Sequence, residues 1–156
     1  SICKNTTAAK PEKISKHWVL DFDKERMYSE QMAKEMHTKC ATVMEDVGNL
    51  SGGNMQKVLL GKWLFAEPDI LILDEPTRGI DVGAKYEIYC IINKMVAEGK
   101  SVIMISSEMP EILGMCDRIY VMNEGKMIAE MDGKDATQEK IMTEIINSGK
   151  TANLGD

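Results

Sequence analysis

The fold of this chain is decided by residues 70–76, which spell ILILDEP. The first four of these residues, 70–73, form a continuous apolar run, which predicts a short strand of a parallel sheet that is buried on both faces. Pro76 stops the strand, because proline cannot donate to a sheet ladder. Asp74 and Glu75 stand at its carboxyl end, where ligands bind in open α/β sheets. An Asp there can hold Mg²⁺ through water and a Glu beside it can accept a proton from water, although the same pair also suits the start of a solvated loop.

A helix and a second strand follow this motif. Asp81 and Gly83 precede an apolar stripe with helical spacing, and Gly99 suits the C′ position where such a helix ends. Residues 102–105, VIMI, predict a second buried strand. Residues 70–105 therefore predict one βαβ unit, and the chain as a whole is predicted to be α/β. The stripe consists of Ala84, Ile88, Ile91, Ile92 and Met95.

Two more helices are predicted upstream. One begins near Tyr28 with Ser29 as its cap, and the other begins at Ser51 and ends before Pro68. In each, the apolar residues are spaced as on one helix face. They are Met32, Ala33, Met36 and Cys40 in the first helix, and Met55, Val58, Leu59, Trp63 and Ala66 in the second.

The last third of the chain is predicted to contain a hairpin between two helices. A short helix is expected near residues 110–115. Strands at 118–122 and 126–131 flank residues 123–125, Asn-Glu-Gly, which are typical of a hairpin turn. Thr137 suits the cap of the final helix. The apolar residues of that helix are Ile141, Ile145 and Ile146.

The composition excludes several classes of protein. A chain of 156 residues with 44% hydrophobic residues can form a packed core and does not resemble a disordered chain. Nineteen basic and 25 acidic residues give a net charge of −6, which argues against a general nucleic-acid binder. The four cysteines form no CxxC pair, so free thiols are favoured over a zinc or redox motif. No apolar run approaches the roughly 20 residues needed to cross a bilayer, and the first residues do not resemble a signal peptide.

Residues 50–56, LSGGNMQ, form the second motif that carries chemistry. Ser51 is an ordinary N-cap residue. Gly52 and Gly53 weaken a helix, but they leave its first N–H groups open to whatever lies in front. Local physics alone leaves two interpretations open, a seat for an anion at the positive end of the helix dipole or a simple capping turn.

Together the two motifs closely resemble those of the ATP-binding-cassette (ABC) family. The pattern LSGGxxQ, then a helix, then LILDEPT matches the signature motif and the Walker B motif of that family in wording, order and spacing. The resemblance runs from about Tyr28 to about Ile146. Further stretches of the sequence resemble the C-terminal cassette of the double-cassette bacterial importers of the ribose, galactose and xylose type. These stretches are residues 47–54, 61–64, 74–85 and 105–111.

The resemblance implies a fragment of a P-loop NTPase-like fold, that of the ABC ATPases. Such a fragment has a mostly parallel sheet with helices on both faces, part of a helical subdomain, and a C-terminal hairpin and helix. We accordingly predict four segments along the chain. They are an irregular N-terminal segment at 1–27, part of the helical and signature subdomain at 28–66, the α/β core from Walker B onward at 67–147, and a tail at 148–156.

The resemblance also implies roles for the residues of the signature region. Ser51, Gly52 and Gly53 would bind the γ-phosphate of an ATP molecule that lies on an opposing cassette. Gln56 would support the geometry of the signature helix. Asp81 would be the D-loop residue that reaches across the cassette dimer.

A second group of residues would serve the chain's own ATP site. Asp74 would help to hold Mg²⁺, and Glu75 would be the catalytic base. Ser107 stands at the switch position, where many cassettes have a histidine; its hydroxyl can hydrogen-bond but cannot carry a positive charge toward the phosphate. The implied cofactors are ATP and Mg²⁺.

The chain departs from the family at the phosphate-binding loop, Walker A. That loop requires Gly-x4-Gly-Lys-Ser/Thr. The only Gly-Lys-Ser/Thr triplets are residues 99–101 and 149–151, and Lys94 and Glu144 stand where the first glycine of the pattern would be. We therefore expect the chain to be the later part of a cassette and to be inactive alone.

The leading hypothesis is part of the ATPase subunit that energises a bacterial monosaccharide importer. The implied partners are a second cassette, membrane permease subunits and, indirectly, a periplasmic sugar-binding protein, at the cytoplasmic face of the inner membrane and without nucleic acid. One alternative is a non-catalytic cassette fragment that docks on a partner but does not bind ATP. A soluble ABC ATPase of DNA repair or translation is disfavoured by the wording of residues 77–83 and by the acidic composition. His17 and His37 match no motif and are expected at the surface, whereas Trp63 is expected in the core.

Overall fold

The computed structural model describes residues 1–152, with side chains described through residue 149. It divides into two compact units, which we describe separately: unit 1 at residues 1–105 and unit 2 from residue 106 onward. The predicted tail at 148–156 falls partly in the last helix, and its residues 153–156 lie outside the described part.

Unit 1 begins with a short buried helix, although residues 1–27 were expected to be irregular. In this helix, α1, Ile2 and Cys3 are almost fully buried and pack with Val43 and Val58. The backbone N–H groups of Ile2 and Cys3 donate to the carbonyls of Glu45 and Val43. The elements over this region are α1 (Ile2–Thr7), η1 (Pro11–Ile14), β1 (Ser15–Lys16), β2 (Val19–Leu20) and the start of α2 (Phe22–Glu35).

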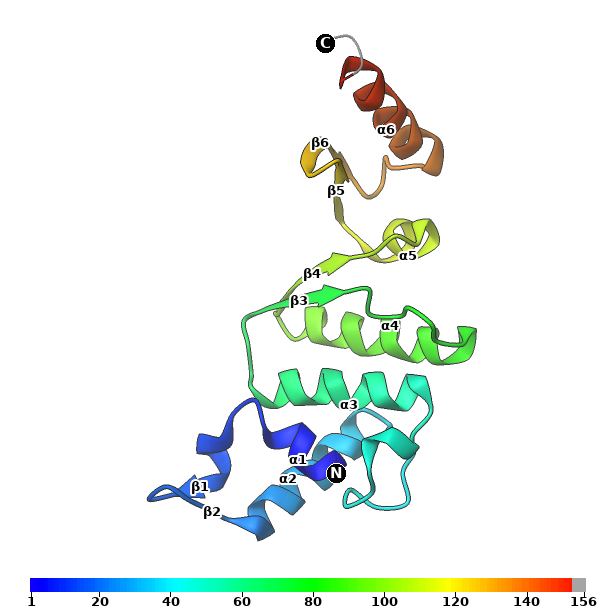
Figure 1. Ribbon diagram of the computed structural model, residues 1–156. Coiled ribbons are helices and arrows are strands. Elements are labelled where there is room, and N and C mark those ends of the chain that lie inside the picture. Colours follow the sequence, from blue (N-terminus) through cyan, green and yellow to red (C-terminus); the bar gives the residue numbers. More distant parts are fainter. Residues whose placement is uncertain (153–156) are drawn as a thin grey trace. The chain divides into compact units, whose positions relative to one another are not determined.

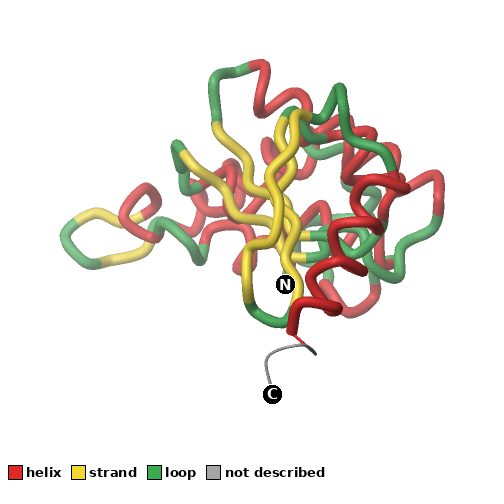
Figure 2. The backbone as a smooth tube through the Cα atoms, turned by 90° about the horizontal axis from the view of Figure 1, so that it is seen from above, coloured by secondary structure: helices red, strands yellow, loops and turns green. Residues whose placement is uncertain are grey.

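Strands β1 and β2 form an antiparallel hairpin that projects from the helices of unit 1 (Figure 1; Figure 2). Its two turn residues, His17 and Trp18, have φ angles of 50° and 68°, as a two-residue hairpin turn requires. Both side chains are exposed, and His37 is exposed as well. The expectation of surface histidines is thus confirmed.

Helix α2 starts six residues before the predicted start at Tyr28. Asp21 is the N-cap, and its carboxylate accepts from the N–H of Lys24. Ser29 is therefore not a cap. It lies inside α2, fully buried, and its hydroxyl donates to the carbonyl of Cys3 at 3.1 Å, which ties α2 to α1.

Helix α3 (Gly52–Phe65) follows a short 3₁₀ turn, η2 (Val47–Asn49), and forms where the sequence predicted it, but it buries a different face. Val58 is buried as expected, whereas Trp63 is 44% exposed and Leu59 is exposed to the same extent. The reason is that two glycines lie on the opposite face and let neighbouring helices approach closely. For example, a Cβ atom on Gly61 would lie 2.9 Å from Cγ of Met32. The buried face consists of Gly53, Lys57, Val58, Leu60, Gly61 and Phe65.

Residues 70–105 form the predicted βαβ unit. It consists of β3 (Ile70–Asp74), α4 (Val82–Ala97) and β4 (Ser101–Ile105), and the two strands pair in parallel with Ile72 opposite Ile103. Gly99, with φ of 89°, follows α4 as expected. Four of the five predicted stripe residues of α4 are buried, namely Ile88, Ile91, Ile92 and Met95.

Strand β3 is buried on one face only, and β4 is half-buried on alternate residues, which corrects the expectation of strands covered on both faces. Leu71 and Leu73 are 6% exposed, whereas Ile72 is 63% exposed. Alternation of this kind is what a strand shows when helices cover a single side of its sheet. The exposed side of the pair carries Ile70, Ile72, Ile103 and Ile105.

Unit 2 contains the predicted hairpin between two helices. Glu124 and Gly125 form its turn with φ angles of 48° and 75°. Ile119, Val121 and Ile141 form its core, whereas Ile146, expected to be buried, is 53% exposed. The elements are α5 (Met109–Met115), β5 (Arg118–Asn123), β6 (Lys126–Asp132) and α6 (Gln138–Ala152).

Membrane-spanning helices are not found among the described residues. None of the helices there combines the length and the apolar character that a bilayer crossing needs.

The one-sided burial of β3 predicts opposite outcomes for two neighbouring residues. Leu73→Thr should lower the free energy of unfolding by more than about 2 kcal/mol, because it removes buried apolar volume and buries a hydroxyl group. Ile72→Thr should change it by less than about 0.5 kcal/mol, because the side chain is already mostly in water and Thr keeps the β-branching. Urea unfolding followed by circular dichroism measures both. Equal losses would mean that both faces of β3 are buried.

Candidate functional site

The carboxyl end of β3 holds Asp74 and Glu75. Asp74 is the last residue of the strand and lies opposite Ile105 of β4, with its side chain exposed. The N–H of Glu75 donates to the carbonyl of Ile105 at 2.8 Å, so the backbone of Glu75 still belongs to the sheet. The φ angle of Glu75 is 47°, a left-handed conformation that costs free energy for a residue with a Cβ atom. The sharp turn therefore sits between the two carboxylates.

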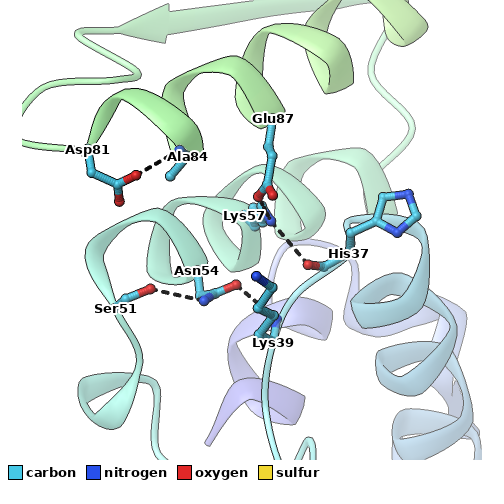
Figure 3. Close-up of polar contacts among 8 residues, drawn as sticks. All are labelled: His37, Lys39, Ser51, Asn54, Lys57, Asp81, Ala84 and Glu87. Carbon is cyan, nitrogen blue, oxygen red and sulfur yellow. Dashed lines mark hydrogen bonds and ion pairs between the residues drawn. The ribbon is translucent and has the colours of Figure 1, made fainter.

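A tight loop leads from this turn into α4. Thr77 and Pro76 are buried, and Gly79 has a φ angle of 72°. Asp81 is the N-cap of α4, and its Oδ1 accepts from the N–H of Ala84 at 2.9 Å (Figure 3). One oxygen of the Asp81 carboxylate thus stabilises the start of α4, whatever else the residue does.

The start of α3 is organised around Ser51. Ser51 occupies the N-cap position, as expected, but its side chain makes no capping hydrogen bond. Its Oγ instead accepts from Nδ2 of Asn54 at 2.9 Å, and Oδ1 of Asn54 accepts from the N–H of Lys39 at 2.8 Å. Asn54 therefore links the hydroxyl of Ser51 to the backbone of Lys39 (Figure 3).

A hollow of about 610 Å³ lies beside this arrangement. Polar side chains of four kinds line it: an amine, a carboxylate, amides and a hydroxyl. Its lining residues include Lys39, Glu45, Asn49, Ser51 and Asn54.

The two glycines of the signature motif have different surroundings. A Cβ atom on Gly52 would meet nothing within 4 Å, so the space in front of its backbone is open. A Cβ atom on Gly53 would lie 2.5 Å from Cβ of Ala84, closer than two carbon atoms can approach. Gly53 is thus required for the packing of α3 against α4, which lie side by side (Figure 1).

One residue of this region was missed by sequence reasoning. Lys57 is 2% exposed, and its ammonium group pairs with the carboxylate of Glu87 on α4 and donates to the carbonyl of His37 at 3.1 Å. The hydrogen bond and charge of Lys57 hold the pKa of Glu87 below its usual range. The spacing contained a clue, since Lys57 lies four residues from both Gly53 and Gly61, on the face where neighbours approach most closely.

Seven of the eight predicted site residues lie in unit 1: Asp74 ends β3, Glu75 follows it in the turn, and the other five lie on α3 or at the starts of α3 and α4. Ser51 and Asp81 lie at the N-terminal ends of α3 and α4 (Figure 3), and Gln56 is half-buried on α3. Ser107 belongs to unit 2, where it follows β4 and is exposed.

The donor set at β3 is compatible with Mg²⁺. Side chains of His, Cys, Asp or Glu form no group of three that could hold a metal within the described part of the chain. Mg²⁺ is commonly held by one or two carboxylates together with substrate phosphates and water. The exposed carboxylate of Asp74 fits such a partial site.

Comparison with known proteins shows which family the chain resembles. The profile described as ABC transporter matches residues 3–78. The chain is 59% identical over 141 residues to the L-arabinose transport ATP-binding protein AraG of Geobacillus stearothermophilus, and 54% identical over 142 residues to the xylose import ATP-binding protein XylG of Geobacillus kaustophilus. The chain is thus similar to ATP-binding proteins of ABC transporters. The ribose import ATP-binding protein RbsA of Rhodococcus jostii, another similar protein, is 46% identical over 142 residues.

The matches cover most of this chain and a minor part of the relatives. They span 90–91% of the chain but only 28% of AraG, XylG or RbsA. The ABC transporter family resemblance predicted from the sequence is confirmed, whereas the roles of individual site residues and the four predicted segments stay predictions.

Solved structures of ATP-binding cassettes share the fold. MJ1267, an ATP-binding cassette of an ABC transporter, superposes with a TM-score of 0.75 at 21% identity, over 92% of this chain and 62% of that one. The dimeric ATP-binding cassette MJ0796 bound to ADP and Pi superposes with a TM-score of 0.71 at 20% identity, over 85% of this chain and 56% of that one. The predicted fold class, a fragment of the ABC ATPase fold, is thus confirmed.

The surroundings of the two glycines predict opposite effects of the same substitution. Gly53→Ala should lower the free energy of unfolding by about 1–3 kcal/mol, because the new methyl group overlaps Ala84. Gly52→Ala should raise it by up to about 1 kcal/mol, because open space surrounds a helical glycine there. Urea unfolding of both variants measures the difference.

A compensating substitution controls for the cause of this loss. Gly53→Ala combined with Ala84→Gly removes the overlap and should recover part of the lost stability. A double variant that is as unstable as the sum of the two single variants would show that the α3–α4 approach is not responsible.

Proposed function

We propose that the chain is part of the ATP-binding, ATP-hydrolysing subunit of a bacterial ABC importer for a monosaccharide. The observation that carries the proposal is the pairing, on a cassette fold, of a glycine-rich helix start at residues 51–53 with an Asp-Glu pair at the end of β3. The sugar class is supported by the names of the relatives, which are L-arabinose, xylose and ribose import proteins.

The signature region would act on an ATP molecule held by a second cassette. Ser51 lies exposed at the start of α3, and Gly52 leaves the backbone N–H groups there open, so both suit contact with a γ-phosphate. Gly53 would serve through its close packing, and Gln56 through the geometry of α3. Asp81 would reach the opposing cassette while one of its oxygens caps α4.

The carboxyl end of β3 would serve the cassette's own site. Asp74 would hold Mg²⁺, which when bound neutralises charge on the phosphates. Glu75 would accept a proton from the attacking water, and its strained backbone would fix the direction of its side chain. Ser107 would hydrogen-bond near the γ-phosphate in place of a histidine.

The whole importer would supply the partners of this subunit. These are a second cassette, the membrane permease subunits and, through them, a periplasmic sugar-binding protein, with the subunit peripheral at the cytoplasmic face of the inner membrane. A non-catalytic cassette fragment that docks without binding ATP is the second candidate. It is favoured by the lack of a Gly-x4-Gly-Lys-Ser/Thr loop among the 156 residues.

Turnover separates an active chain from one that needs another segment to bind ATP. We expect the purified chain to hydrolyse no ATP and to bind Mg-ATP at most very weakly, because it has no loop to surround the phosphates. Isothermal titration and a phosphate-release assay measure both quantities. Micromolar binding, with hydrolysis that is lost in Glu75→Gln, would overturn this expectation.

The signature role predicts ATP-dependent association with a complete cassette. A single complete cassette whose catalytic Glu is replaced by Gln should bind the chain in the presence of Mg-ATP and not in its absence. Ser51→Asp should abolish this binding, because a carboxylate repels the γ-phosphate. The variant should stay folded, because Asp is as good an N-cap as Ser and suits the positive end of the helix.

A matched control uses the same change at another helix start. Thr137 precedes α6, and its hydroxyl accepts from the N–H of Lys140. Thr137→Asp should leave the association unchanged in size-exclusion chromatography with light scattering. Association that is independent of ATP, or unaffected by Ser51→Asp, would refute the signature role.

A further inference from the structure

Lys57 is the one basic side chain in the buried part of the described residues. It lies on α3, six residues after Ser51, and its side chain is 2% exposed. An ammonium group taken out of water loses several kcal/mol of hydration, and it is tolerated only when partners replace the lost contacts. The partners of Lys57 therefore indicate what this buried charge does.

Two groups from two other elements hold the ammonium of Lys57 (Figure 3). The carboxylate of Glu87 on α4 forms an ion pair with it, and the carbonyl of His37 accepts a hydrogen bond at 3.1 Å. Glu87 is itself 47% exposed, and the charge of Lys39 also acts on it. One buried side chain thus joins α3, α4 and the segment between α2 and η2.

The contacts of Lys57 lie one turn beyond the closest approach of the two helices. Gly53 meets Ala84 at the starts of α3 and α4, and Lys57 meets Glu87 one turn further along both. The helices therefore run in the same direction. Two contacts in succession fix how far α3 slides along α4 and how it rotates on it, whereas one contact would leave rotation free.

Stability alone does not account for a charge at this position. A buried ion pair is often no more stabilising than well-packed apolar residues of similar volume, and the best-attested use of such pairs is to specify register. An apolar residue at position 57 would fill the same space without dictating which residue of α4 it faces. Lys57, in contrast, is satisfied only when α3 lies along α4 so that its ammonium reaches the carboxylate of Glu87.

The same segment that Lys57 holds also orients Ser51. The carbonyl of His37 bonds to Lys57, and two residues later the N–H of Lys39 bonds to Asn54, which in turn bonds to the hydroxyl of Ser51. Loss of the Lys57 contact would release this segment and, through Asn54, the Ser51 hydroxyl.

We propose that Lys57 is a positioning residue that sets the signature motif against the start of α4 and so aligns Ser51 with Asp81 for contact with an opposing cassette. The proposal rests on the proposed function for the ligand, the γ-phosphate of ATP on an opposing cassette. The geometric part, the alignment of α3 on α4, concerns the free chain and is tested without ATP.

The first test is the amide spectrum of the free chain. In ¹H–¹⁵N NMR spectra, Lys57→Met and Glu87→Gln should both shift or broaden the resonances of Ser51, Gly52 and Asn54. Lys57→Met keeps about the volume of the side chain, removes the buried charge and leaves Glu87 half exposed to water, so at least this first variant should fold. Glu87→Gln keeps an oxygen that can accept a hydrogen bond from the ammonium of Lys57. Unchanged resonances in both folded variants would overturn the proposal.

The second test is the ATP-dependent association with a hydrolysis-deficient complete cassette. Lys57→Met should raise the Kd about tenfold, as expected for a residue that couples two sites, while urea unfolding shows a chain that remains folded at the assay temperature. Lys57→Arg, which keeps the charge, should recover most of the affinity. The Lys57→Met and Glu87→Gln effects should not add in the double variant, because they remove one interaction.

A surface ion pair of α4 provides the matched control. Lys94 lies 3.3 Å from Glu35 of α2, and the two side chains are 55% and 36% exposed. Lys94→Met should leave the resonances of Ser51 and the Kd unchanged, since surface pairs contribute little. Failure of the unaltered chain to associate, with resonances that still depend on Lys57, would refute the proposed function and leave the positioning role standing. Association that requires Ser51 and is insensitive to Lys57→Met would refute the positioning role alone.

Discussion

The close packing of α3 on α4 is the constraint on which the rest of unit 1 depends. Gly53 permits it, because any Cβ atom there would overlap Ala84. The Lys57–Glu87 ion pair then fixes its register one turn later. Since α3 begins at the signature motif and α4 begins at Asp81, this one helix pair sets the distance between two predicted ligand contacts. It also positions β3 indirectly, because β3 connects the two helices in sequence.

The N-terminal residues support the same helix pair from the other side. Cys3 of α1 is joined to α2 through the hydroxyl of Ser29, and α1 packs on Val58 of α3. At the far end of α3, Lys13 donates to the carbonyl of Phe65, which would otherwise be an unpaired group at a helix end. Residues that carry no motif thus hold both ends of the helix that carries the signature.

The sequence was a good guide where local chemistry decides structure. The βαβ unit at 70–105, Gly99 after α4 and the hairpin turn at 124–125 each follow from patterns that involve only neighbouring residues. The family and the fold class followed from two motifs whose wording and spacing are specific. Three isoleucines and one methionine of α4 are buried as predicted, because their spacing places them together on one face of the helix.

Predictions failed where contacts between distant residues decide. Trp63 is apolar but lies on the exposed side of α3, because the glycines at 53 and 61 draw neighbours to the opposite face. Ser29 resembles a cap, yet it lies inside α2, and its hydroxyl is within hydrogen-bond distance of the carbonyls of Glu25 in the same helix and of Cys3, 26 residues away. Lys57 is of a residue type usually found at the surface, and it is buried because His37 and Glu87, 20 and 30 residues away in the sequence, accept its hydrogen bonds.

The isoleucine side of β3 and β4 has a consequence for how the chain behaves in solution. Ile70, Ile72, Ile103 and Ile105 are each more than half exposed and occupy one face of a two-stranded parallel sheet. A contiguous apolar patch on an uncovered sheet promotes association with other molecules, and unpaired strand edges can form hydrogen bonds with strands of other chains. The net charge of −6 opposes such contact through repulsion. Colloidal behaviour should therefore depend on ionic strength, with salt that screens the repulsion promoting aggregation through this face.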